Sequence, residues 1–296
     1  MTTCAAVEDR YMRRMQRLAI FFAVALLFSF CLKAFSKIAY NNLLPKLILQ
    51  RIDSFFDLTS TQESYLQTRI AVHHEWHRTT QLKLYLADLK NLRGRFHAGL
   101  TGKDLDWLTE RLTHHRNALF SRVIPDLVVV LQTLSESQIT YLEKKLAKEN
   151  KELAQKLARP LVVRQEEEFT TIIKYAEDWA GKLSTEQKER LRAHYMSLPD
   201  TVSDWLSYRK DQQRVFIGLL RSRPDHATLV KDLEGRMIYQ ERNVPQRFRA
   251  GFLRSMQLLR EMILTADQLL TPEQRRNVIR KADEYIRLVE ELAPKP

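Results

Sequence analysis

The chain has 296 residues, of which 28% are charged, and it contains only 7 glycines and 2 cysteines. This composition excludes a glycine-rich fibrous protein and a disulfide-stapled scaffold, and it favours long solvated helices over sheets. The formal net charge of +12 is spread along the chain, with both signs on nearly every predicted helix. It therefore indicates solvated helical faces, with an anionic lipid or cell-wall surface as the alternative partner, and it argues against nucleic-acid binding.

The most hydrophobic part of the chain is residues 18–32, LAIFFAVALLFSFCL, fifteen residues without a charge. Four arginines precede it: Arg10, Arg13, Arg14 and Arg17. A spanning helix usually needs about 20 apolar residues and a secretory signal about 7–15, so the length fits both a membrane anchor and a signal peptide. In both cases the retained positive charge keeps the N-terminus inside the cell and directs the rest of the chain outward.

Cys31 closes this apolar segment and is a candidate lipidation site. In a lipoprotein signal, the cysteine is acylated and becomes the new N-terminus. Such signals place a small residue before the cysteine, whereas Phe30 stands there. The alternative is an uncleaved anchor, whose flanking basic side chains can reach the two membrane interfaces. Translation from Met12 or Met15 would leave a shorter basic stretch before the same segment.

A short motif, Leu-Ser/Thr-x-x-Gln, recurs along the rest of the chain and predicts helix starts. It is a capping box, in which the hydroxyl accepts from the backbone of the third helical residue and the glutamine there accepts from the backbone N–H of the cap. Pro272 suits the first helical position, where its missing N–H costs nothing. The motif occurs at residues 58–62, 134–138, 183–187, 264–268 and 270–274, and a looser copy lies at 100–104.

Apolar residues between these starts recur at helical spacing, whereas no segment has a convincing strand pattern. Helix ends are expected near the helix-breaking residues Gly99, Pro160, Pro199, Pro224 and Pro245. We therefore expect an all-α fold, with an N-terminal membrane anchor or lipoprotein signal at residues 1–35 and an elongated bundle of about eight helices. The bundle divides into an N-terminal helical region, 36–160, and a C-terminal helical region, 161–296.

Several motifs in the first half resemble a family of bacterial envelope lipoproteins of unknown function. They are Ala-Tyr-Asn-Asn-Leu at 39–43, Phe-Asp-Leu-Thr-x-x-Gln at 56–62, His-x-Trp-His-Arg at 74–78 and Lys-Glu-Asn at 148–150. The resemblance extends over about residues 36–155. It implies a helical, periplasm-facing protein that is made as a lipoprotein, and it brings no catalytic residues.

The repeated Leu-Thr-x-x-Gln motif is also similar to that of periplasmic stress chaperones, which carry it on curved helical hairpins. This weaker resemblance implies binding of polypeptides. The capping box explains the same repeats without any function, because it arises wherever a helix begins.

Tyr40, Asn41 and Asn42 form the most specific feature after the apolar segment, and Trp76 belongs to the His-x-Trp-His-Arg motif. We expect these four residues to dock the anchor against the helical body or to bind a partner. In the docking interpretation, the Tyr-Asn-Asn segment caps the helix that follows the membrane.

The histidines are the weak candidates for a metal site. His73 and His77 lie one helical turn apart, as metal-binding pairs do, and His114 and His115 fall on the next predicted helix. The pair shares an apolar stripe with Leu66, so partly buried packing or a pH-responsive contact explains it as well. We predict no metal and no cofactor.

The sequence contains no glycine-rich phosphate loop, no G-x-S-x-G elbow and no H-E-x-x-H motif. We therefore predict no catalytic residues and a non-enzymatic protein of the bacterial cell envelope, membrane-anchored with its body in the periplasm. Its partners are expected to be polypeptides or envelope assembly proteins, and not nucleic acid. The alternative is an envelope hydrolase whose active-site residues converge from distant positions.

Overall fold

The computed structural model describes residues 39–239 and 244–293, and in these ranges the chain is helical, with short connections and no strand. The expected all-α class is confirmed. The predicted anchor or signal at residues 1–35, with Cys31, lies outside the described residues. Within the described ranges no single helix is long and apolar enough to cross a membrane, and α5 and α6 meet that test only as a pair bent by 119°.

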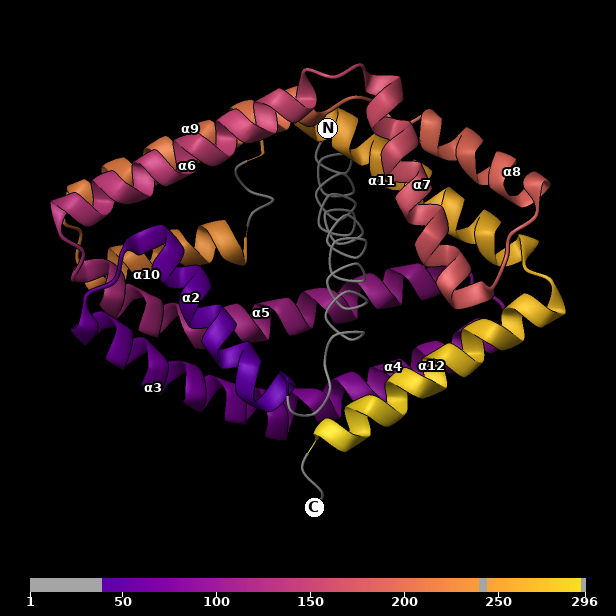
Figure 1. The fold of residues 1–296 in the computed structure, drawn as a ribbon, viewed down its shortest axis with the longest axis horizontal. Helices are drawn as coiled ribbons and strands as arrows, with labels where there is room; N and C mark the ends of the chain where they lie inside the picture. The colour runs from indigo at the N-terminus through magenta and orange to yellow at the C-terminus, as the bar shows by residue number, and fades with distance from the viewer. Residues whose placement is uncertain (1–38, 240–243, 294–296) are drawn as a thin grey trace, which may run out of the picture.

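The helices run in pairs around the perimeter of a flattened body (Figure 1). Those of the N-terminal region are separated by short turns, except that α2 follows η1 directly and that α3, η2 and α4 follow one another directly. Their bounds are η1 Ala39–Leu43, α2 Leu44–Phe56, α3 Ser60–Trp76, η2 His77–Gln81, α4 Leu82–Ala98, α5 Gly102–Gln132 and α6 Glu136–Leu157. The segments η1 and η2 are single π-helical turns, a form that is frequent at functional sites.

The C-terminal region returns along the N-terminal one, so helices far apart in sequence lie side by side. Helix α9 runs along α6, and α12 runs along α4 (Figure 1). The bounds are α7 Leu161–Ala180, α8 Thr185–Met196, α9 Val202–Arg221, α10 His226–Met237, α11 Gln246–Leu269 and α12 Pro272–Leu292. The eleven α-helical segments among the described residues exceed the eight or so that the sequence predicts. One reason is the π-helical turn η2, which divides α3 from α4 between the predicted start at 58–62 and the predicted end near Gly99.

The predicted helix starts are confirmed at five of the six motif copies. Complete capping boxes begin α3, α5, α6, α8 and α12, with the cap residues Thr59, Thr101, Ser135, Ser184 and Thr271. The predicted start at residues 264–268 is wrong, because these residues form the last turns of α11. There the buried Asp267 carboxylate accepts from Leu100 N–H at 2.9 Å and from the Arg275 guanidinium at 2.9 Å.

The apolar residues of the described chain collect in separate clusters. The largest joins α5, α6, α9 and α10 around Val128 and Ile139. A second joins α7, α8 and α11, and a third joins η1 and α4 to the C-terminal helix α12. The first cluster lies directly beside α2, and this is where the candidate site is found.

Candidate functional site

Two motif glutamines tie the starts of α3 and α6 together. Gln62 and Gln138 are both buried, and the amide of Gln138 donates to Oε1 of Gln62 at 2.8 Å. Each Oε1 also accepts from its own cap, at 3.0 Å from Thr59 N–H and 3.0 Å from Ser135 N–H. The Gln138 amide further donates to the carbonyl of Asp57 at 2.8 Å, which secures the turn between α2 and α3.

The motif copies at 183–187 and 270–274 make the same bridge at the opposite end of the molecule. Gln187 begins α8 and Gln274 begins α12, and their amides donate to each other's Oε1 at 2.8 Å and 3.1 Å. The amides also donate to the carbonyls of Leu269 and Lys182. Capping chemistry predicted the helix starts, but the pairing of the glutamines depends on tertiary structure and left no signal in the sequence.

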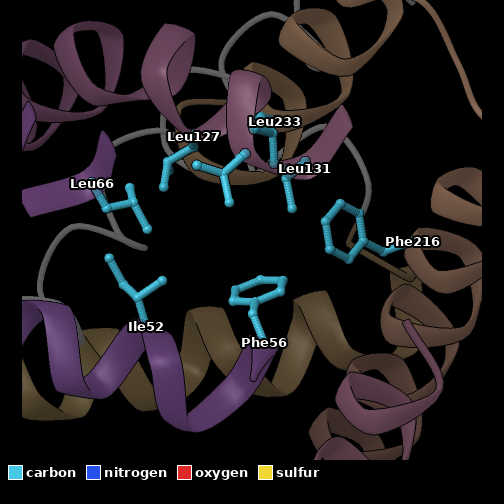
Figure 2. Close-up of a pocket in the computed structure, with 8 residues that line it drawn as sticks. Ile52, Phe56, Leu66, Leu127, Leu131, Phe216 and Leu233 are labelled. Atoms are coloured by element: carbon cyan, nitrogen blue, oxygen red, sulfur yellow. The ribbon is translucent and has the colours of Figure 1, made fainter. Parts of the chain in front are cut away.

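An apolar cavity of about 130 Å³ lies beside the first glutamine bridge, between α2 and the largest apolar cluster. Figure 2 shows Ile52 and Phe56 of α2 on one side of it, facing the leucines of α3, α5 and α10, with the ring of Phe216 from α9 closing a further side. Eight side chains line it, all of them apolar: Ile52, Phe56, Leu66, Leu127, Val130, Leu131, Phe216 and Leu233.

The helix that covers this cavity is only partly packed. Seven of the thirteen residues of α2 are Leu, Ile or Phe, yet none of its residues is buried. By contrast, Leu66, Val130 and Leu131 on the opposite wall are buried. An enclosed cavity of about 150 Å³ with apolar walls accepts benzene, so this half-open one has room for a single aromatic or branched apolar group. Its walls offer no polar group to orient a reaction.

A second notable contact joins the two π-helical turns. The hydroxyl of Tyr40 in η1 lies 2.7 Å from Nδ1 of His77 in η2, and the Tyr40 ring lies 4.8 Å from the ring of His74. Tyr40 is buried and packs with Leu82 and Val289. The family motifs at 39–43 and 74–78 therefore meet in space, and a docking role for Tyr40 stays a prediction.

The other predicted docking residues differ in their exposure. Asn41 is half-buried and Asn42 is exposed. Trp76 is half-buried, with the guanidinium of Arg122 4.9 Å above its ring. A role for these residues in binding a partner stays a prediction.

The candidate histidines are distributed over separate contacts. His73 Nε2 lies 2.6 Å from Asp126, and His115 Nε2 lies 2.6 Å from Asp88, whereas His114 is exposed. In the part of the chain that the structure describes, no group of three His, Cys, Asp or Glu side chains is arranged to hold a metal ion.

Burial shifts the pKa values of several histidines and tyrosines near the Tyr40–His77 contact. It lowers the pKa of His77 to about 4, with a smaller contribution from nearby His74, and it also lowers the pKa of His115. For the same reason the pKa of Tyr85 rises to about 12, and that of Tyr40 rises as well. His77 is consequently neutral at neutral pH and can share a hydrogen bond with Tyr40.

A family model, described as a family of unknown function (DUF6279), matches residues 54–247. The chain belongs to the DUF6279 family. The match includes the cavity residues from Phe56 to Leu233, the Gln62–Gln138 bridge and His77, whereas Ile52 and most of α2 precede it. The expectation of an uncharacterised family is thereby confirmed, whereas the likeness to lipoproteins and to chaperones stays a prediction. No curated protein and no solved structure matches the chain.

Proposed function

We propose that this DUF6279 protein is a non-enzymatic binding protein of the bacterial cell envelope, anchored to a membrane with its helical body in the periplasm. Its partners are apolar segments of polypeptides, including envelope assembly proteins. The observation that carries the proposal is the cavity beneath α2, with apolar walls and a covering helix that has no buried residue.

The energetics of such a site favour transient binding. Full burial of one Leu or Phe side chain contributes about 1.5–3 kcal/mol. A single side chain in the cavity therefore selects an apolar segment without holding it tightly, and contacts elsewhere on the partner must supply the remaining affinity. This behaviour suits a protein that holds and releases polypeptides.

The lining of the cavity supports a binding role, because it consists of apolar side chains alone. A hydrolase instead needs polar groups that converge in a cleft.

Membrane attachment rests on the sequence of residues 18–32 and on the position of Tyr40. The apolar segment ends only eight residues before Tyr40, whose contact with His77 secures the chain to the body. In this proposal the attachment is made either by an acylated Cys31 or by the uncleaved apolar segment.

The test is suppression of aggregation of denatured citrate synthase by the full chain in lipid nanodiscs. Val130→Phe places a ring in the cavity, and Val163→Phe makes the same change at an exposed position of α7. We expect the wild type and Val163→Phe to suppress aggregation and Val130→Phe to lose most of this effect, with unchanged helicity in all three. Equal suppression by both variants would contradict a role for the cavity, and no suppression by the wild type would contradict polypeptide binding.

A further inference from the structure

The turn before α2 and the outward face of α2 carry apolar side chains that do not line the cavity. Leu43, Leu47 and Ile48 are 51%, 54% and 39% exposed. Leu43 and Leu47 are four residues apart and lie on one side of the helix, and the exposed Ile48 follows Leu47 at the border with the inward side. Together the three exposed side chains make up an apolar patch. The inward positions Ile52 and Phe56 line the cavity, and α2 therefore presents apolar side chains in two directions.

The charge beside this patch is positive. Lys46 is exposed, and the side chain of Arg51 is 67% exposed, with a 3.4 Å contact to Glu149. The first turn of α2 contains no acidic residue, and Asp53 is the first one along the helix. Leucines flanked by basic residues are typical of helices that lie in the headgroup region of an anionic membrane.

Chain length places the patch near the membrane. Leu43 comes eleven positions after Leu32, the end of the apolar segment. Even a fully extended chain of this length spans at most about 40 Å. A tether of this length keeps the bilayer at high effective concentration around α2, which favours a lipid surface over a diffusing partner.

The chain that leads from the apolar segment to α2 also contacts the body at Tyr40. Tyr40 lies between the apolar segment and the patch, and it is buried against Leu82 and Val289 with its hydroxyl 2.7 Å from His77 Nδ1. The segment that leads from the membrane and the helix that carries the patch therefore belong to one packed unit. α2 therefore has a fixed position relative to Tyr40, the point where the chain from the apolar segment meets the body.

We propose that Leu43, Leu47 and Ile48, with Lys46, lie in the headgroup region of an anionic phospholipid bilayer and orient the body on the membrane. The proposal rests on the membrane attachment proposed above. The outward face of α2 contacts lipid while its inward face covers the polypeptide cavity, so a bound segment is held next to the membrane surface.

The test uses a photoreactive diazirine amino acid in the full chain, reconstituted in liposomes of phosphatidylethanolamine and phosphatidylglycerol. It is placed at Leu47, at Val215 of α9 as a matched control that is 56% exposed, and at Ala25 within the apolar segment. Mass spectrometry identifies the adducts. We expect lipid adducts at Ala25 and Leu47, and at least fivefold fewer at Val215.

Each other result is decisive. Adducts at Ala25 but none above the Val215 level at Leu47 would overturn the orientation while leaving the attachment intact. Failure of the protein to float with the liposomes, together with no adducts at Ala25, would overturn the attachment and the inference with it. An adduct of twice the chain mass at Leu47 would show that a second copy covers the patch.

A charge variant tests the headgroup preference. Lys46→Glu should reduce the lipid adducts at Leu47 severalfold in liposomes that contain phosphatidylglycerol, and should leave those at Ala25 unchanged. Lys210→Glu, which changes an exposed lysine of α9, is the control and should leave both unchanged. Equal yields of lipid adducts at Leu47 from Lys46→Glu and Lys210→Glu would contradict the preference for anionic headgroups.

Discussion

Replacing one glutamine of a bridge should destabilise the protein more than the loss of a helix cap alone. Gln138→Ala removes three contacts at once: the acceptor for Ser135 N–H, the donor to the Asp57 carbonyl and the bond to Gln62. A net hydrogen bond contributes about 0.5–1.5 kcal/mol, and a buried amide left without its partner costs about 1–3 kcal/mol. We expect a loss of about 3 kcal/mol.

The assay is thermal unfolding of the full chain in mild detergent, followed by circular dichroism. For a domain of 150–250 residues, Tm falls by about 2–4 °C per kcal/mol, so Gln138→Ala should lower Tm by about 6–12 °C. A helix cap alone is worth about 1 kcal/mol and would lower Tm by only about 2–4 °C.

Double variants separate the bridge from the caps. Gln62→Ala and Gln138→Ala remove the two halves of one bridge, so their combined effect should be smaller than the sum of the single effects by at least about 1 kcal/mol. Gln62 and Gln187 belong to different bridges, and their effects should add within about 0.5 kcal/mol. Additivity for Gln62 with Gln138 would refute the bridge.

Three further outcomes are expected. Because burial lowers the pKa of His77 from 6.5 to about 4, the unfolded state binds more protons between these values, and folding stability should fall as pH drops from 6.5 to 4, by up to about 3 kcal/mol. His77→Gln should flatten this part of the stability profile measured by denaturant titration, and an identical slope would contradict the burial of a neutral imidazole. Saturating benzene should raise the Tm of the wild type but not of Val130→Phe, and an equal rise in both would place the bound benzene outside the cavity. The intact mass of the membrane-extracted protein should show an acylated N-terminal Cys31 if the signal is processed as in lipoproteins, whereas a mass that includes residues 1–30 would assign the attachment to the uncleaved segment.

Local physics made the helix starts predictable. A hydroxyl at the cap and a glutamine three residues later satisfy backbone donors within one turn, so Ser135 and Thr271 could be placed from sequence alone. The same motif at 264–268 misled because α11 continues through it to Leu269, and Asp267 serves the neighbouring loop instead.

The candidate site depended on contacts that sequence does not encode locally. Leu66 was expected on a buried stripe and is buried. Its place in a cavity depends on residues of α5, α9 and α10 that lie more than 60 positions further along the chain. The histidines of that stripe could be located, while their partners Asp126 and Tyr40 could not, because each lies on another segment. Asp57 ended α2 by a left-handed conformation that an ordinary aspartate gives no reason to expect.

The central claim is that the cavity accepts an apolar side chain of a polypeptide, and fluorescence anisotropy tests it directly. The full chain in nanodiscs is titrated against two labelled peptides of serine, glycine and lysine, one with a single central phenylalanine and the other with alanine there. Burial of the ring predicts that the wild type binds the phenylalanine peptide at least about tenfold more tightly, and that Val130→Phe loses this preference. Equal Kd values of the wild type for the two peptides would contradict the account.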